Sequence, residues 1–236
     1  MTLNSLFRKG LYHGIPIALG YLSVSFGFGI MSVRLGLGVL DTVIISLTNL
    51  TSAGQAAGVG IIAACGGLIE MIMTQFVINL RYALMALSLS QKLDDKFNTT
   101  RRMIVAFGIT DEIFAVASVQ KGKIQPVYMY GLILISAVGW TLGTFLGAAA
   151  GNILPQMITD AMGLLLYGMF LAIIIPPARE SRSVLFVVAV AALISILFYY
   201  VLTFVSSGFA IIISAVGAAL LGAWLFPIPD EEEKQE

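Results

Sequence analysis

The chain has 236 residues, of which 58% are hydrophobic and only 11% are charged. Its 13 basic and 13 acidic residues cancel to a net charge of zero, which excludes the basic footprint of a nucleic-acid-binding protein. Soluble domains contain about 25% charged residues, and a mean hydropathy of +0.96 is typical of proteins that cross a bilayer several times. We therefore expect an all-α polytopic membrane protein, a single transporter domain over residues 1–236, with six to eight transmembrane helices, some broken or re-entrant.

The N-terminal region contains one clear span and one short apolar stretch. Residues 1–10 include two basic residues and are predicted to form a cytoplasmic N-terminus. The apolar run from Ile15 to Val33 is too long for a signal peptide and lacks an Ala-x-Ala cleavage pattern, so we expect a retained first span. The next apolar stretch, Thr42–Leu50, is shorter than the roughly 20 residues that a span requires.

A polar break follows this short stretch and carries Gly54 and Gln55. Beyond it, a new apolar run extends from Ala56 to Ile78. A short apolar arm, a polar break and a second apolar run indicate a broken helix or a re-entrant arm. Its unwound backbone must be buried by protein or line a wet cavity. An ordinary loop outside the membrane is the alternative.

Charged side chains interrupt the apolar sequence at Glu70 and Arg81, and Asn79 lies close to the arginine. A charge at the bilayer centre costs roughly 2.5–3.5 kcal/mol, so each needs a partner or a function. In an unbroken helix the two charges would share one face but lie about 16 Å apart along the axis, so we do not expect them to pair. For Arg81 the alternative is a side chain that reaches the cytoplasmic headgroups.

A second polar group, Thr110-Asp111-Glu112, lies near the middle of the apolar stretch Met103–Val119. The hydrophilic loop Gln91–Arg102 precedes this stretch and Lys121-Gly122-Lys123 follows it, and both basic flanks are predicted to be cytoplasmic. This pattern favours a re-entrant hairpin that carries its carboxylates near the turn. A span whose far end breaks the charge rule is the alternative.

The C-terminal half contains predicted helices with faces of small residues. One helix is expected to run from Pro126, which suits a first helical turn, to about Ala150. Glycines at every fourth position from Gly139 to Gly151 should allow a second helix to approach closely. A second face of this kind comprises Ser214, Ala218 and Gly222.

The remaining segments complete the predicted topology. Asn152–Asp160 has no basic residue and is expected outside, whereas Pro176-Pro177 should stop the helix 161–175 on the inside, beside two arginines. Two further spans, 184–204 and 209–226, lead to an acidic tail over residues 227–236. Both termini are therefore predicted to be cytoplasmic, in a multi-pass protein of the plasma (inner) membrane.

Five short motifs occur in an order that is typical of one transporter family. They are Gly14-Ile15-Pro16, Phe26-Gly27-Phe28-Gly29, Ser52-Ala53-Gly54-Gln55, Asn79-Leu80-Arg81-Tyr82 and Thr110-Asp111-Glu112. Through them, the stretch from Leu11 to Phe226 resembles the AzlC family, the large subunit of two-component branched-chain amino acid exporters. The resemblance implies export of leucine, isoleucine, valine and methionine, driven by an ion gradient, with a small AzlD-type membrane subunit as obligate partner.

A zwitterionic amino acid needs a partner for each of its charges and an apolar pocket for its side chain. Arg81, or the backbone N–H groups of a half-helix near Gly54 and Gln55, are candidates to hold the carboxylate. Asp111 or Glu112 are candidates to hold the ammonium group or a coupling proton. We expect Arg81 to pair with one of these acids in one conformation, and substrate or proton to compete for that pair. The candidate substrate-binding or ion-coupling residues are Arg81, Asp111, Glu112, Glu70, Asn79, Gln55, Gly54 and Thr110.

Other functional classes have less support in the sequence. The chain has one histidine, one cysteine, and neither a His-Glu-x-x-His nor a Gly-x-Ser-x-Gly motif, so we expect no enzyme, no catalytic residue, no metal and no other cofactor. A channel or passive pore for a small solute is one alternative, because broken helices and buried charges also build selectivity filters. A structural membrane subunit is another, although it has no use for the intramembrane charges.

Overall fold

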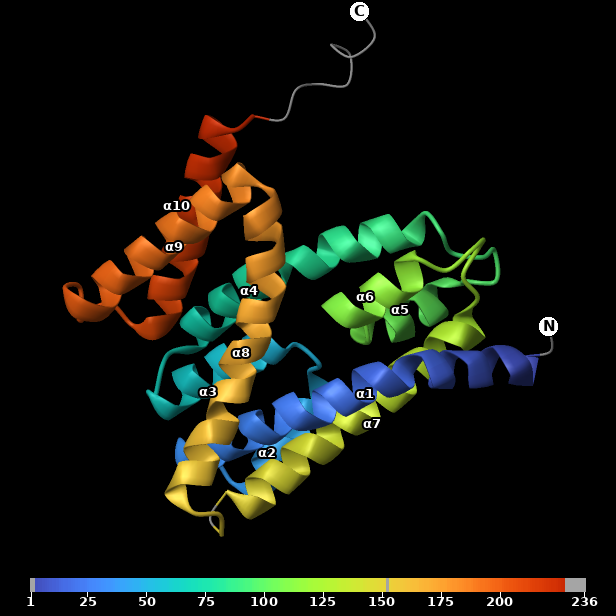
Figure 1. Cartoon of the computed structure of the whole chain (residues 1–236), viewed down its shortest axis with the longest axis horizontal. Helices are drawn as coiled ribbons and strands as arrows, with labels where there is room; N and C mark the ends of the chain where they lie inside the picture. The colour runs from blue at the N-terminus through green and yellow to red at the C-terminus, as the bar shows by residue number, and fades with distance from the viewer. Residues whose placement is uncertain (1–2, 152, 228–236) are drawn as a thin grey trace, which may run out of the picture.

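The computed structural model describes residues 3–151 and 153–227, which form an all-α fold of ten helices (Figure 1). Residues 1–2 of the predicted cytoplasmic N-terminus, Asn152 of the predicted outer loop and 228–236 of the predicted acidic tail lie outside the described residues. The helices are α1 (Leu3–Arg34), α2 (Val39–Thr48), α3 (Ser52–Ala63), α4 (Leu68–Ser90), α5 (Thr99–Phe107), α6 (Asp111–Ser118), α7 (Pro126–Ala150), α8 (Gln156–Glu180), α9 (Arg182–Tyr200) and α10 (Ser207–Leu225).

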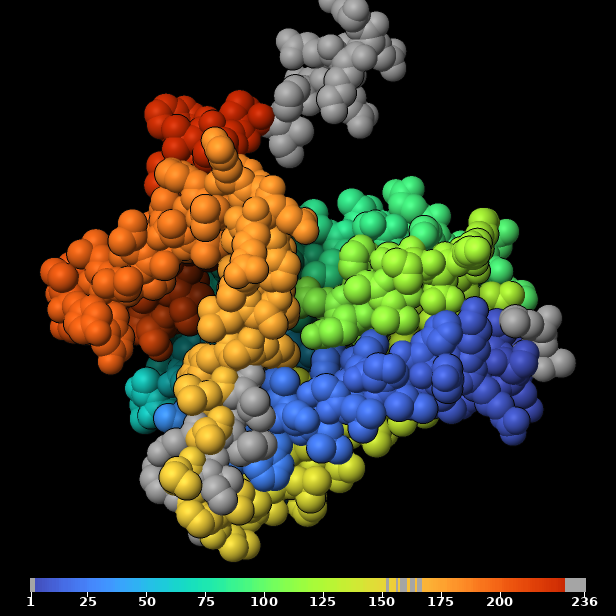
Figure 2. All heavy atoms as spheres, viewed as in Figure 1, coloured from blue at the N-terminus to red at the C-terminus, as the bar shows by residue number. Residues whose placement is uncertain are grey.

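Within the described ranges, five helices are long and apolar enough to cross a membrane: α1, α4, α7, α9 and α10. Helix α8 has 25 residues, as many as α7. In the space-filling view α8 crosses the molecule between the α9–α10 hairpin on one side and the N-terminal helices on the other (Figure 2). The chain is therefore a polytopic all-α membrane protein, as predicted.

Helices α1 and α7 form the packed centre of the fold. A Cβ atom added to Gly139, Gly143 or Gly147 would come within 3 Å of the backbone of Ala18, Leu22 and Phe26, respectively, so only glycine permits this contact. The residue numbers increase together along both helices, which shows that α1 and α7 run parallel. The predicted glycine face is confirmed, and the contact buries Trp140 and Phe28 almost completely.

The apolar run from Ala56 to Ile78 is divided between two helices, because α3 ends at Ala63 and α4 begins at Leu68. Cys65 between them has a positive φ of 54° and is followed by two glycines, which have low helix propensity. The Gly66 N–H donates to the Ile61 carbonyl at 2.8 Å and closes α3. As a result, Glu70 lies in the first turn of α4 rather than within a longer helix.

The predicted helix stop at Pro176-Pro177 is wrong, because α8 continues to Glu180. The φ angle that proline imposes is compatible with a helix, and each proline removes only one backbone donor. Both prolines lie in the last turns of α8, and the Ser181 N–H donates to the Pro177 carbonyl at 3.0 Å.

Two short hairpins of broken helix, α2–α3 and α5–α6, pack between these long helices. The chain enters and leaves α5–α6 at one end of the molecule, because Leu93 and Ile124 form a β-bridge and Lys123 pairs with Asp95 at 3.1 Å. This is the geometry of the predicted re-entrant hairpin. The α2–α3 hairpin lies near the opposite end of α1, where Ser32 and Thr42 are hydrogen-bonded at 2.8 Å (Figure 1).

Candidate functional site

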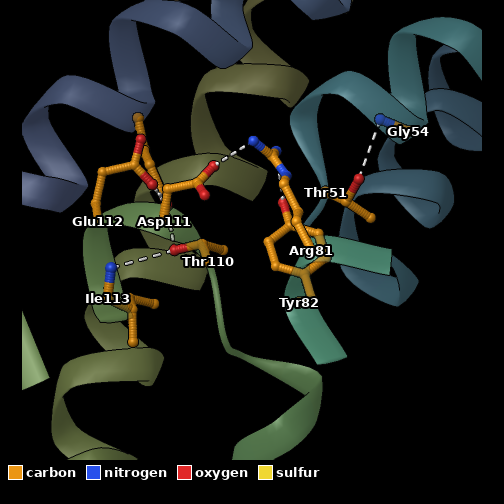
Figure 3. Close-up of polar contacts among 9 residues, drawn as sticks. Thr51, Gly54, Arg81, Tyr82, Thr110, Asp111, Glu112 and Ile113 are labelled. Atoms are coloured by element: carbon orange, nitrogen blue, oxygen red, sulfur yellow. Dashed lines mark hydrogen bonds and ion pairs between the residues drawn. The ribbon is translucent and has the colours of Figure 1, made fainter. Parts of the chain in front are cut away.

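The breaks of the two hairpins converge on the middle of α4, where Arg81 and Asp111 form an ion pair (Figure 3). Arg81 Nη1 lies 2.9 Å from Asp111 Oδ2, and the two side chains are 37% and 25% exposed. The pairing of Arg81 with an acid of the second polar group, expected from the sequence, is therefore present in this conformation. Arg81 also donates to the Tyr82 hydroxyl at 3.2 Å and lies over the Tyr82 ring.

Asp111 and Glu112 occupy the first turn of α6, and Thr110 is its N-cap. The Thr110 hydroxyl accepts a hydrogen bond from the Ile113 N–H at 3.3 Å. The Tyr21 hydroxyl of α1 lies 2.6 Å from Thr110 Oγ1 and donates to Glu112 Oε2 at 2.5 Å. Carboxylates are stabilised at a helix N-terminus by its partial positive charge, so this end of α6 carries its own counter-charge.

The N-terminus of α3 faces the same place from the other side, and Thr51 is its N-cap (Figure 3). The Thr51 hydroxyl accepts the Gly54 N–H at 3.0 Å and interacts with the Tyr82 side chain. No acid follows Thr51 in the first turn of α3. A small cavity of about 100 Å³ lies between the breaks, lined by Thr51, Tyr82 and Ile109 among others. Two half-helix N-termini, one acidic and one neutral, thus flank Arg81.

Amide side chains connect α4 to this neutral N-terminus. Gln75 Nε2 donates to the Gly54 carbonyl at 2.7 Å, and Asn79 Nδ2 donates to Gln75 Oε1 at 3.1 Å. Gln55 Nε2 donates to Ser46 Oγ of α2 at 2.9 Å. Three buried polar atoms of this region have no hydrogen-bond partner among the described residues, namely Gln55 Oε1, Asn79 Oδ1 and Arg81 Nε. Such groups are rare in native proteins and are typical of a site that receives a polar ligand or water.

Glu70 lies at a different place from the other candidate residues. Its Oε1 atom accepts hydrogen bonds from Ser206 Oγ at 2.6 Å and from the Gly208 N–H at 2.9 Å. Glu70 is 7% exposed and stabilises the N-terminus of α10. The structure therefore joins Arg81, Asp111, Glu112, Thr110, Asn79, Gln55 and Gly54 around the two breaks and leaves Glu70 apart from them.

Sequence reasoning missed Tyr21, Thr51 and Gln75, which complete the contacts of the two breaks. A tyrosine in an apolar span has no signal of its own, since packing explains it equally well. A signal existed for Thr51, because threonine at the start of a new apolar run is a typical N-cap. No group of three or more His, Cys, Asp or Glu side chains that could hold a metal occurs in the described part of the chain.

Comparison with known proteins relates this architecture to one family. Residues 16–154 match the model of the family described as AzlC protein. An uncharacterized membrane protein of Archaeoglobus fulgidus is 31% identical over 228 residues, covering 95% of this chain and 97% of the relative. Inner membrane protein YgaZ of Escherichia coli (strain K12) is 26% identical, covering 97% and 95%. No solved structure matches this chain. The matched region contains both hairpins and the Arg81–Asp111 pair, and the chain belongs to the AzlC family.

Proposed function

We propose that this chain is the large subunit of a secondary transporter that exports branched-chain and other apolar amino acids. The observation that carries the proposal is the Arg81–Asp111 ion pair, which lies between two half-helix N-termini. Broken helices that meet at such a point are typical of the substrate sites of secondary transporters. Family membership supports a transport role, and the substrate class follows from the family resemblance of the sequence motifs.

A zwitterionic amino acid can replace both partners of the ion pair at once. Its carboxylate would bind Arg81 and the free N–H groups of α3, and its ammonium group would bind Asp111 or Glu112. Breaking the pair without replacement leaves two charges in a medium of low dielectric constant, which is costly. The zwitterion avoids this cost because it supplies one charge of each sign.

A proton can open the same pair by a different route. When Asp111 takes up a proton it loses its charge and releases Arg81, but it can then no longer pair with the ammonium group of the substrate, so proton and substrate compete for Asp111. Substrate and proton therefore act on one ion pair, and this shared element would couple export to a proton gradient. Thr110 and Tyr21 act as positioning residues, because their hydrogen bonds hold the first turn of α6 beside Arg81.

The proposed setting combines the name of one relative, the pattern of basic residues and the family resemblance of the motifs. The inner membrane is in line with the name of the Escherichia coli relative, and the cytoplasmic position of both termini rests on the basic residues of the sequence. The partner proposed for it is a small AzlD-type membrane subunit. Leucine, isoleucine, valine and methionine are the proposed substrates.

The test is efflux of preloaded leucine from proteoliposomes that contain this chain with or without the AzlD-type subunit. We expect efflux that requires the partner and falls more than tenfold in Arg81→Ala. Lys123→Ala serves as the matched control, because it removes an exposed positive charge that pairs with Asp95 at the surface. We expect its efflux to stay within twofold of wild type. If the wild-type chain with its partner subunit transports no leucine, the proposed substrate class is contradicted. If Arg81→Ala retains full leucine efflux, the proposed site is contradicted.

A further inference from the structure

A second cavity lies between α2, α3 and α4, next to the small cavity beside Tyr82. Its volume is about 200 Å³, and it is lined by four apolar side chains, Ile45, Val59, Ile62 and Met71, together with the amides of Gln55 and Gln75. An engineered apolar cavity of about 150 Å³ in another protein holds a benzene molecule, so this volume suits a branched aliphatic group. Thr48 and Asn49 line both this cavity and the smaller one beside Tyr82, so the two are adjacent.

Features of its wall distinguish this cavity from a packing defect. Gln55 is 1% exposed and its Oε1 atom has no hydrogen-bond partner among the described residues. A purely structural wall would not leave such an atom buried, because an unsatisfied polar group opposes folding. Ile62 is 48% exposed, so the cavity can be reached from the surface.

One face of α4 gives the cavity an orientation relative to the ion pair. Met71, Gln75 and Asn79 follow each other at four-residue spacing and so lie on one side of the helix. Met71 contributes apolar surface to the cavity and the two amides follow it towards the level of Arg81, which lies about 160° around the helix from Asn79. An amino acid with its side chain beside Met71 would extend its charged groups towards the small cavity at Tyr82, whose hydroxyl accepts a hydrogen bond from Arg81.

Two larger cavities lack these features. One of about 440 Å³ adjoins Lys96 and Arg101, and one of about 310 Å³ lies between α9 and α10. Neither is lined by any of the buried unpartnered polar atoms identified among the described residues, and neither shares a lining residue with the small cavity beside Tyr82.

We propose that the cavity between α2, α3 and α4 binds the aliphatic side chain of the substrate and sets its permitted size. This inference rests on the proposed function and adds the residues that select among amino acids. Gly58 determines the depth of the cavity, because a Cβ atom there would lie 3.1 Å from Gln75 Nε2 and 3.5 Å from Met71 Sδ. Met71 closes the same end and can be shortened to enlarge it.

The test compares transport of alanine, valine, leucine and phenylalanine by proteoliposomes that contain the chain and its small partner subunit. Gly58→Ala adds one methyl group to the cavity wall, and we expect the ratio of leucine to alanine transport to fall about tenfold or more. Gly60→Ala is the matched control, since it lies on the same helix and its Cβ atom would meet nothing within 4 Å. Both changes raise helix propensity equally, so a difference between them reports the cavity.

Met71→Ala supplies the opposite change and guards against a Gly58→Ala protein that does not fold. We expect it to raise transport of phenylalanine relative to leucine about tenfold. If wild type transports leucine and both variants keep the wild-type ratios of substrate transport, this inference is overturned and the proposed function stands. A uniform loss for all four amino acids in Gly58→Ala, with unchanged ratios in Met71→Ala, would overturn it as well. Wild type that moves none of the four would overturn the proposed function, and this inference with it.

Discussion

The two broken hairpins have the same backbone arrangement but differ in charge, since one second helix begins with acids and the other does not. Each has a short helix, a break of a few residues, and a second short helix whose N-cap is a threonine, Thr51 in α3 and Thr110 in α6. Each threonine also contacts a tyrosine of a long helix, Tyr82 for Thr51 and Tyr21 for Thr110. The two tyrosines lie 61 positions apart in the sequence, and the two threonines lie 59 positions apart.

The first turns after the two threonines differ. Asp111 and Glu112 follow Thr110, whereas Ser52 and Ala53 follow Thr51. The α6 N-terminus is therefore already occupied by carboxylates of its own chain, and one of them holds Arg81. The α3 N-terminus has no such acid and can receive a carboxylate from outside. On the proposed function, the charge of two first-turn residues, rather than backbone geometry, therefore distinguishes the half-helix that binds Arg81 from the half-helix that binds the substrate carboxylate.

The largest effect should come from separating Arg81 from Asp111. We expect Arg81→Ala and Asp111→Ala each to lower the free energy of unfolding by roughly 2 kcal/mol, less than for a fully buried pair because both side chains are partly exposed. The double variant should be more stable than the sum of the single losses predicts, because it leaves no unpaired charge. Unfolding in detergent measures all three. Strictly additive losses would contradict a direct interaction.

Making the first hairpin resemble the second should abolish transport without harming the fold. Ser52→Asp places an acid where α6 has Asp111, and the α3 dipole should stabilise it by about 0.3–1 kcal/mol. We expect leucine efflux to fall more than tenfold, because the new carboxylate competes with that of the substrate. Ser52→Asn is the uncharged control of the same shape. Full efflux by Ser52→Asp would show that α3 does not receive the substrate carboxylate.

Removing the two threonine N-caps should lower the free energy of unfolding by different amounts. Thr51→Ala should cost about 1 kcal/mol, the usual value for a helix N-cap. Thr110→Ala should cost about 1.5 kcal/mol, because Thr110 is 3% exposed and water cannot replace its hydrogen bonds, whereas Thr51 is partly exposed. Serine at either position should restore most of the stability. Equal losses in thermal unfolding would refute the assigned difference between the hairpins.

The smallest effect is expected at the surface of the second hairpin. Lys123 and Asp95 pair at 3.1 Å, but their side chains are 61% and 95% exposed. We expect Lys123→Ala to change the free energy of unfolding by less than about 0.5 kcal/mol, and less still at high salt. A loss as large as that of Arg81→Ala would mean that the surface pair, rather than the inner one, holds the hairpin in place.

The free-energy cost of unpaired charges in a membrane and the spacing of glycines made part of this architecture predictable from the sequence. An arginine and two acids in apolar segments need partners, and that requirement predicted the pairing of Arg81 with the Thr110–Glu112 segment. Glycines at four-residue spacing on α7 predicted a close helix contact, which α1 provides. Basic residues on both flanks predicted the α5–α6 hairpin, because an excess of lysine and arginine indicates the cytoplasmic side of the membrane. This rule can be applied without knowing which residues they pair with.

Other features depend on contacts between distant segments or on single backbone angles. The role of Glu70 requires Ser206 and Gly208 of α10, which lie more than 130 positions away. The turn at Cys65 interrupts a continuous apolar run, where hydropathy alone shows no boundary. The cavity beside Gly58 exists only because α2, α3 and α4 meet there. None of these follows from periodicity or composition, because each depends on which elements become neighbours.

The proposed function requires that substrate and proton both act on the Arg81–Asp111 pair. The most direct test is proton movement during leucine export by proteoliposomes containing the chain and its small partner subunit. We predict that leucine transport by wild type is accompanied by proton movement. Asp111→Asn, inserted at normal levels, should still exchange leucine across the membrane but without coupled proton movement. Leucine-coupled proton movement of wild-type size in Asp111→Asn would contradict the claim.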